Sequence, residues 1–219
     1  MSRFFLILSL ALSTSASAQE LTAPEQKALI ARLQSQRAEF PAMSGEFSEE
    51  KTTRLLTKPI VSSGEIAFLA PNKFRREIRG NSPSTTVCNG KELWIHYPKF
   101  NEAEHYTLGE KQFFDDSLAA LTAGLNFDGV EKFFAVAAAK DRAGYRIVLT
   151  PRTASLRRIL TALTVWLDAG GTIQKADATL PKGDRIVTTY KNLRPAKTNA
   201  AKFEFTPPPD VKVSTPLGK

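Results

Sequence analysis

Two runs of sequence decide the fold: Gly64-Glu-Ile-Ala-Phe-Leu-Ala-Pro-Asn-Lys-Phe74-Arg-Arg-Glu-Ile78 and, after a short break, Cys88-Asn-Gly-Lys-Glu-Leu-Trp94-Ile-His-Tyr97-Pro98. In both runs apolar and aromatic residues cluster, and the dipeptides Pro-Asn, Asn-Gly and Tyr-Pro separate the clusters. Short apolar runs bounded by such residues are typical of strands joined by tight turns. The two runs therefore predict a meander of strands.

Alternation within the first run assigns side chains to faces. Ile66 and Phe68 share one face, whereas Glu65, Ala67 and Leu69 share the other, because successive side chains of a strand point to opposite sides. One face is bulky and the other is mixed, so this sheet needs cover on one side only.

The rest of the chain adds strands and a few helices. Residues 22–40 predict an amphipathic helix, with Thr22 and Glu25 as a capping box and Pro41 as its stop. Apolar residues broken by glycines in 113–123 and 130–137 predict two short helices that cover the sheet as a lid. Further strands are predicted at 43–55, 106–108, 144–151, 160–168, 172–180 and 185–190, and in the Phe203 and Phe205 ending. The prediction is a mainly β chain with some α structure: a single curled antiparallel sheet covered by short helices.

The N-terminus predicts export. A charged start at Arg3, an apolar run from Phe4 to Leu12 and the Ala16-Ser-Ala18 exit are typical of a secretory signal peptide; an uncleaved anchor is the alternative. We expect residues 1–18 to be removed and residues 19–219 to form a single domain. Gln19 rather than cysteine follows the expected cut, so we expect a free protein without an N-terminal lipid.

Composition narrows the function classes. The 42% hydrophobic and 24% charged residues exclude a disordered or fibrous chain. The net charge is +8, but the basic residues are scattered without a dense patch, so we expect a solvated surface and no nucleic-acid partner. Cys88 is the only cysteine, which excludes an internal disulfide and favours a small buried thiol.

Catalytic patterns are missing from the sequence. His96 and His105 have no cysteine or second histidine at metal-ligand spacing. Asp115 and Asp116 open an apolar helical segment, where acidic residues favourably oppose the helix dipole. No nucleophile elbow or phosphate-binding glycine loop occurs. We therefore expect a protein that is not an enzyme and uses no cofactor and no metal.

Several motifs together resemble the periplasmic outer-membrane lipoprotein carrier family (LolA type). They are Pro71-Asn-x-Phe74, Asn89-Gly-Lys-x-Leu93-Trp94, Leu149-Thr-Pro151, Asp168 to Ile173, and the ending from Ala200 to Val213. The resemblance covers nearly the whole chain after the signal peptide. It implies an open β half-barrel, capped by helices, that works in the periplasm as a monomer.

The resemblance also implies a function and partners. The cargo would be an acylated lipoprotein or lipid, taken from an inner-membrane ATP-driven extraction complex and passed to an outer-membrane receptor of similar fold. An acyl chain of roughly sixteen carbons costs on the order of 12 kcal/mol to bring into water, at about 0.8 kcal/mol per methylene. Such cargo needs a hydrophobic cavity, and the residues expected to bind lipid there are Phe68, Phe74, Trp94, Phe114, Leu118 and Phe133.

One departure from the family pattern leaves the cargo open. The family has an arginine before the proline of Pro-Asn-x-Phe that ties the sheet to the lid, whereas this chain has Ala70; Arg76 replaces an aromatic residue of the pattern. Arg75 or Arg76 is the candidate for holding the lid instead. Carriage of another acylated lipid or glycolipid is the main alternative, and a non-transport binding module, such as an envelope-stress sensor domain of this fold, is a third.

Overall fold

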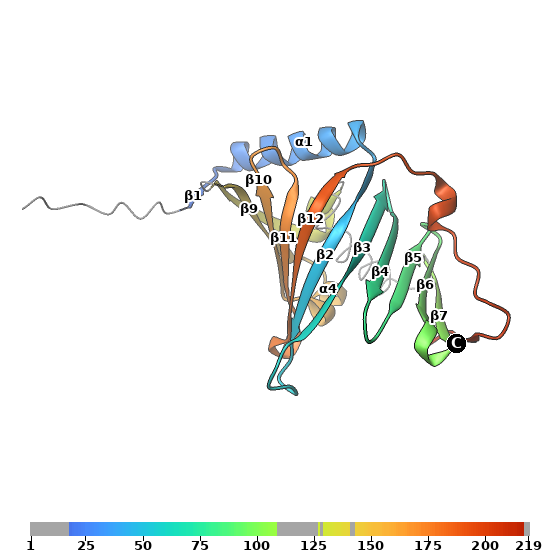
Figure 1. Cartoon of the computed structure of the whole chain (residues 1–219). Coiled ribbons are helices and arrows are strands. Elements are labelled where there is room, and N and C mark those ends of the chain that lie inside the picture. The colour runs from blue at the N-terminus through green and yellow to red at the C-terminus, as the bar shows by residue number, and fades with distance from the viewer. Residues whose placement is uncertain (1–17, 109–126, 128, 141–142, 217–219) are drawn as a thin grey trace, which may run out of the picture.

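The computed structural model describes residues 18–108, 127, 129–140 and 143–216 (Figure 1). Thirteen strands in these ranges form one sheet, whose spatial order is β1-β8-β9-β10-β11-β12-β2-β3-β4-β5-β6-β7-β13. The strands are β1 (Gln19–Glu20), β2 (Ala42–Thr52), β3 (Ile60–Leu69), β4 (Lys73–Arg79), β5 (Ser84–Cys88), β6 (Glu92–Tyr97), β7 (Glu102–Thr107), β8 (Phe134–Lys140), β9 (Gly144–Pro151), β10 (Ala162–Asp168), β11 (Ile173–Thr179), β12 (Arg185–Pro195) and β13 (Lys212–Ser214).

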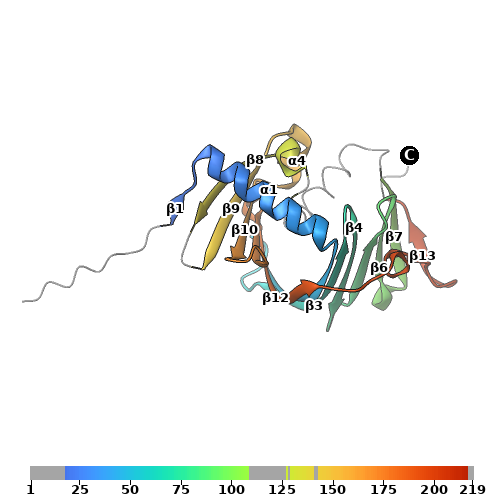
Figure 2. The same cartoon turned by 90° about the horizontal axis from the view of Figure 1, so that it is seen from above.

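The sheet curls into an open trough. Its two ends in the strand order, β1 and β13, do not pair with each other, and the view from above shows the sheet bent like a U with helix α1 (Ala23–Glu39) across the open side (Figure 2). Shorter helices are α3 (Val130–Phe133) and α4 (Ala154–Ile159), and single 3-10 turns are η1 (Pro98–Phe100), η2 (Pro181–Gly183) and η3 (Ala200–Phe203). The predicted single curled sheet with few helices is confirmed, with one parallel strand pair, β13 on β7.

Helix α1 begins and packs as its sequence predicts. The Thr22 backbone N–H donates to the Glu25 carboxylate at 2.8 Å, which completes the capping box. Its buried side chains are Leu29, Ile30 and Leu33, which recur at helical spacing and face the sheet. Phe40, just past the helix end, is 44% exposed, so the buried apolar stripe ends at Leu33, about two turns earlier than expected.

The Asn-Gly motif forms the turn between β5 and β6. The Asn89 side-chain oxygen accepts hydrogen bonds from the backbone N–H groups of Lys91 and Glu92, each at 2.9 Å. Gly90 has a φ of +91°, a conformation that glycine adopts without strain. The Asn89 amide also donates to the Glu204 carboxylate at 2.9 Å, so the same residue attaches the C-terminal segment to the sheet.

Two secondary-structure predictions are wrong, and a third lies outside the described residues. The predicted helix at 130–137 ends at Phe133, and Phe134 to Lys140 form β8, paired along its whole length with β9. Alanine favours helix on its own, but pairing with a neighbouring strand overrides that weak local preference. The predicted last strand at Phe203 and Phe205 is instead η3 followed by extended chain, and β13 is the last strand. The predicted helix at 113–123 falls outside the described ranges.

No helix in the part of the chain that the structure describes is long and apolar enough to cross a membrane.

Candidate functional site

The inner, concave face of the sheet carries an apolar row that crosses five strands. Strand register places Met43, Phe68, Phe74, Cys88 and Leu93 opposite one another in turn, from β2 to β6. Phe68 and Phe74 are each 2% exposed, and Leu93 is half-buried. The alternation argument therefore placed Phe68 and Phe74 correctly on the same bulky face.

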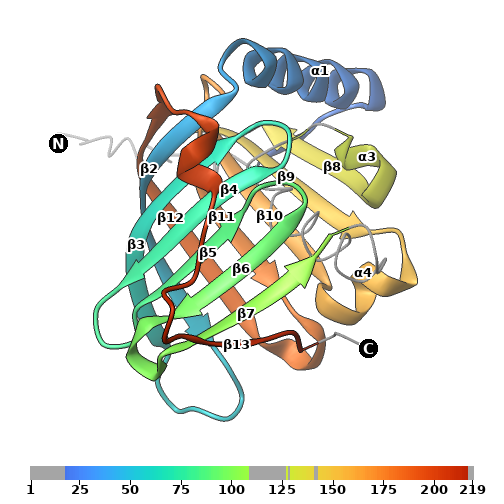
Figure 3. The same ribbon diagram turned by 90° about the vertical axis from the view of Figure 1, so that its right-hand side faces the viewer.

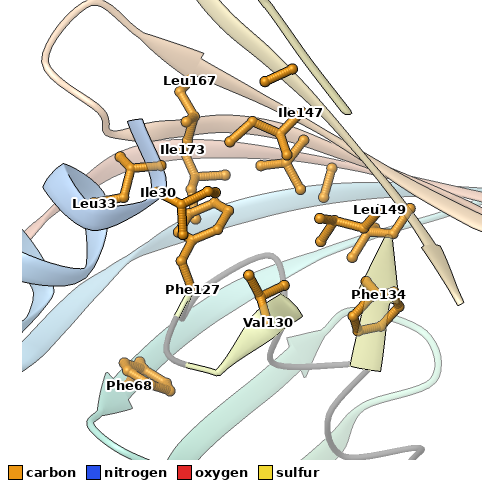
Figure 4. Close-up of a cluster of buried hydrophobic side chains, with 14 of the residues drawn as sticks. Ile30, Leu33, Phe68, Phe127, Val130, Phe134, Ile147, Leu149, Leu167 and Ile173 are labelled. Carbon is orange, nitrogen blue, oxygen red and sulfur yellow. The ribbon is translucent and has the colours of Figure 1, made fainter. Parts of the chain in front are cut away.

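The opposite half of the trough is filled by helix α1. Ile30 and Leu33 reach down from the helix toward Ile173, and Phe127 and Val130 lie beside them (Figure 4). The Gln34 side-chain amide donates to the Phe127 backbone carbonyl at 3.0 Å, which holds that segment under the helix. This half of the inner face is packed protein core.

A cavity of about 490 Å³ lies where α1 ends and the β3–β4 turn begins. It is lined by Gln34, Ser35, Arg37, Ala38, Pro41, Ala70 and Pro71. Its size falls in the range of small-molecule pockets. The family-pattern proline Pro71 and the departure at Ala70 both form part of its wall.

Arg37 is a site residue that the sequence analysis missed. Its guanidinium carbon lies 5.7 Å from the centre of the Phe68 ring. Its Nε atom is buried and has no hydrogen-bond partner among the residues that the structure describes. Burial lowers the pKa of Arg37, because a low-dielectric surrounding disfavours the charged form. Arg37 follows Leu33 by four residues, so helical spacing alone puts it on the buried face. An arginine thus adjoins Pro71 here, supplied by the helix and not by the strand.

Arg76 also lies on the inner face, where it is tied to the sheet. Its guanidinium pairs with the Glu49 carboxylate at 2.6 Å, and its Cζ atom is 4.3 Å from the centre of the Phe47 ring. Thr188 donates its hydroxyl to the same carboxylate at 3.2 Å. The observed partners of Arg76 therefore come from β2, and its predicted role in holding a lid stays a prediction.

A pair of polar side chains from β7 also lies on the inner face. The Tyr106 hydroxyl donates to the Glu104 carboxylate at 2.5 Å. Burial, together with the nearby Glu104 charge, raises the pKa of both Tyr97 and Tyr106. Leu93 pairs with Tyr106 and Ile95 with Glu104, so apolar and polar side chains alternate across this half of the trough.

Trp94 is on the other face of the sheet, which corrects its assignment to the lipid-binding set. Strand register places it opposite Val87 and His105. Its ring stacks on His105 with centroids 4.1 Å apart and contacts Phe205 at 5.7 Å. The C-terminal segment covers this outer face (Figure 3). Phe203, which belongs to this segment, is completely buried. Trp94 therefore belongs to the packing of the C-terminal segment.

Arg75 also faces outward, on the side of the sheet away from the trough, and its predicted role in holding a lid stays a prediction. Its Nε atom pairs with the Glu77 carboxylate at 2.6 Å. Its Nη1 atom donates to the backbone carbonyl of Lys202 at 3.5 Å. Strand register puts it opposite Ala67 and Val87, away from the trough. Arg75 attaches the C-terminal segment to the convex side of the sheet.

The remaining predicted residues have different outcomes. Phe133, the last residue of α3, is half-buried and packs against the inner cluster. Phe114 and Leu118 lie outside the described residues. Cys88 is fully buried and donates its thiol to the Asn72 carbonyl at 3.3 Å; burial raises the pKa of this thiol. In the described ranges, no cluster of three or more histidine, cysteine, aspartate or glutamate residues could hold a metal ion.

The pKa of Tyr190 gives a testable pH dependence. Burial on the inner face, with Glu49 adding to it, raises this pKa to about 12. An acid whose pKa is raised by folding stabilises the fold below its unfolded pKa, about 10 for tyrosine, and that contribution is lost as the pH rises. The stability of the parent relative to Tyr190→Phe should fall by roughly 1 kcal/mol between about pH 8 and pH 11. Urea unfolding at both pH values measures this difference, and a constant gap would contradict it.

The fold and the inner face define a class: an open, curled sheet with an apolar trough partly covered by one helix. The model of the family "Outer membrane lipoprotein carrier protein LolA" matches residues 38–206, and the chain belongs to this family.

Individual relatives agree with this assignment. An outer-membrane lipoprotein carrier protein of Dechloromonas aromatica is 29% identical over 170 residues, which is 76% of this chain and 77% of that protein. One from Pectobacterium carotovorum is 28% identical over 152 residues, 68% of each chain. The crystal structure of an uncharacterized conserved protein from Thermus thermophilus has the same fold, with a TM-score of 0.52 and 12% identity over 87% of this chain and 99% of that one.

Proposed function

We propose that this protein is a periplasmic carrier that shields the acyl chains of lipoproteins in its trough and moves them from the inner to the outer membrane. The apolar row from Met43 to Leu93 is the observation that carries the proposal. It runs across five strands of a sheet that remains open. The names of the relatives, outer-membrane lipoprotein carrier proteins, support the same function.

The division of the trough suits reversible binding. The α1 half is filled by the protein's own side chains, whereas Leu93, Ile95 and Tyr106 in the β6–β7 half are only half-buried. Shielding an acyl chain against these side chains removes apolar surface from water, at about 25 cal/mol per Å². A site that is only partly covered provides moderate affinity, which a carrier needs in order to release its cargo.

Arg37 is our candidate for coupling α1 to the trough. It contacts Phe68 through its guanidinium and lines the cavity beside Ala70 and Pro71. A helix shift that opens this cavity would also uncover the Phe68 ring. Arg76 stays a second candidate because it faces the trough, although its present partner is Glu49.

The proposal includes a route and partners. Residues 1–18 would be removed on export, and the protein, as a monomer, would receive cargo from an inner-membrane ATP-driven extraction complex. It would pass the cargo to an outer-membrane receptor of similar fold. Similarity to lipoprotein carriers supports the choice of these partners.

Carriage of another acylated lipid or glycolipid is the second candidate function, and one observation favours it. Glu104, Tyr106 and the Arg76–Glu49 pair place hydrogen-bonding groups on the inner face, next to the apolar row. Such groups could bind the hydroxyls of a polar headgroup close to its acyl chains.

One experiment separates the two functions. The protein is expressed with its signal sequence, purified from the periplasm and examined by intact and native mass spectrometry. We expect a polypeptide that begins at Gln19, in part bound to triacylated lipoproteins, and we expect the purified protein to release lipoproteins from spheroplasts. Bound lipid without lipoprotein would favour the second function. A protein that carries neither, and takes up no fluorescent acyl probe, would exclude both.

A further inference from the structure

The hairpin between β2 and β3 exposes an apolar tip. Leu55 and Leu56 are 91% and 49% exposed, and Ile60 and Val61 behind them are 50% and 69% exposed. The described part of the chain has few large hydrophobic residues that are exposed, and these four lie within one stretch of seven residues. Single exposed hydrophobic side chains are ordinary, but a contiguous exposed group marks an interaction surface. We call residues 53–61 the hairpin tip.

The tip is a formed turn that presents its leucines at the end of the molecule. The Leu56 N–H donates to the Thr53 carbonyl at 3.3 Å, and the Leu55 N–H donates to the Thr53 hydroxyl at 3.4 Å. The Arg54 N–H reaches the Asp184 carboxylate at 3.4 Å, which joins the turn to the neighbouring η2 loop. The hairpin projects past the rest of the sheet, at the end remote from α1 (Figures 1 and 3). A flat surface could therefore touch both leucines without meeting the body of the sheet.

Basic residues flank the leucines in the chain and on the adjoining η2 loop. Residues 50–61 and the adjoining 181–185 hold five basic and two acidic side chains, a net charge of +3. The basic ones are Lys51, Arg54, Lys58, Lys182 and Arg185. Arg185 pairs with Asp177, and the other four are exposed. Exposed leucines among exposed basic residues combine the two attractions that hold a protein on an anionic membrane surface: apolar burial at the headgroup boundary and attraction to the headgroups.

We propose that the hairpin tip docks the protein on anionic lipid bilayers. Leu55 and Leu56 enter the boundary between headgroups and acyl chains, and the four exposed basic side chains contact anionic headgroups. Two leucines and four cations give weak, reversible attachment. This contact is independent of the trough, so it requires no particular cargo. It would bring the molecule to the membrane with the hairpin end first.

Vesicle flotation tests the proposal. The protein from Gln19 onward is mixed with vesicles of phosphatidylcholine alone, or of phosphatidylcholine with about a quarter phosphatidylglycerol. We expect binding to the anionic vesicles that weakens with salt. The double variant Leu55→Ser/Leu56→Ser should lose about tenfold or more in affinity, because it removes the inserted apolar surface. Arg54→Gln/Lys58→Gln should lose the preference for anionic lipid.

The control is Phe100→Ser. Phe100 is 67% exposed and follows Lys99, but it lies in η1 between β6 and β7; this variant should bind vesicles like the parent. Failure of the parent to bind anionic vesicles, or equal binding by the double-serine variant, would overturn the proposal. Loss of cargo transfer to a receptor by that variant, without any vesicle binding by the parent, would identify a protein interface instead and also overturn it. Uptake of an acyl probe in solution, measured on the same variants, tests the trough separately.

Discussion

A carboxylate placed at Ile95 should greatly weaken acyl-chain binding and leave the fold intact. Ile95 faces the trough from β6, is half-buried, and lies opposite Glu104. Ile95→Asp would put a second carboxylate next to the first on the surface that is to contact acyl chains, and an unpaired charge is costly against hydrocarbon. We expect probe affinity to fall by roughly a hundredfold, equivalent to about 3 kcal/mol. Fluorescence titration with an acyl probe measures the change.

Thr85→Asp is the matched control for Ile95→Asp. Thr85 is half-buried on the neighbouring strand β5 and lies opposite Glu77, so it also gains a carboxylate beside a glutamate. It faces outward, because Thr86, next to it, is opposite Ile95. We expect it to bind the probe like the parent and to have a similar thermal midpoint to Ile95→Asp. Equal loss of uptake in both variants would show a general effect of charge, and unchanged uptake in both would remove the β6 inner face from the site.

Gly64→Ala should strongly destabilise the sheet. A Cβ atom at Gly64 would lie 1.8 Å from the Glu77 carbonyl oxygen and 3.1 Å from Cε1 of Phe47. The obstacle is backbone of the adjacent strand β4, so it cannot move aside as a side chain could. Strands β3 and β4 must separate, which breaks the ladder beneath the apolar row. We expect a loss of more than about 4 kcal/mol in the free energy of unfolding, the range of severe single mutations.

The comparison variant is Gly80→Ala. Gly80 has a φ of +98°, but a Cβ atom there has no neighbour within 4 Å. Gly80→Ala should therefore lower the free energy of unfolding by only about 1 kcal/mol, through the strained backbone conformation alone. Urea unfolding of both variants separates the two causes. Similar losses for the two would mean that the curled sheet relaxes around the close approach at Gly64.

Local signals predicted the elements that depend on neighbours in the chain. The capping box at Thr22 and the helical spacing of Leu29, Ile30 and Leu33 located α1, because both involve residues within one or two turns. The Asn89-Gly90 turn was predicted for the same reason: its hydrogen bonds close within three residues. Alternation assigned Phe68 to the inner face because β3 continues without interruption through it.

The failures come from contacts between distant segments. The Ala-rich run after Phe133 became β8 because β9 offered a full-length partner, and no local property of the run encodes that pairing. The prediction for Trp94 rests on alternation alone, which does not say which face of β6 lines the trough. The C-terminal segment, with Phe203 and Phe205, gives the outer face an apolar cover of its own, so bulk does not distinguish the two faces of β6.

The arginines near Pro71 also separate what local sequence predicts from what contacts between distant segments decide. The sequence showed that Ala70 stands where the family has an arginine, and it suggested Arg75 and Arg76 because they are near in the chain. Alternation separates these two and puts Arg76, two residues after Phe74, on the same face as Phe74. Only the tertiary structure places Arg37 over Phe68 and beside Pro71, since that contact needs α1 to lie across the trough. Local periodicity and motifs were enough for most of the strands, the first helix and the family, but not for β8 or β13. Tertiary packing decided that α1 covers the inner face of the sheet and the C-terminal segment covers the outer face. Both results depend on contacts between segments that are far apart in the chain.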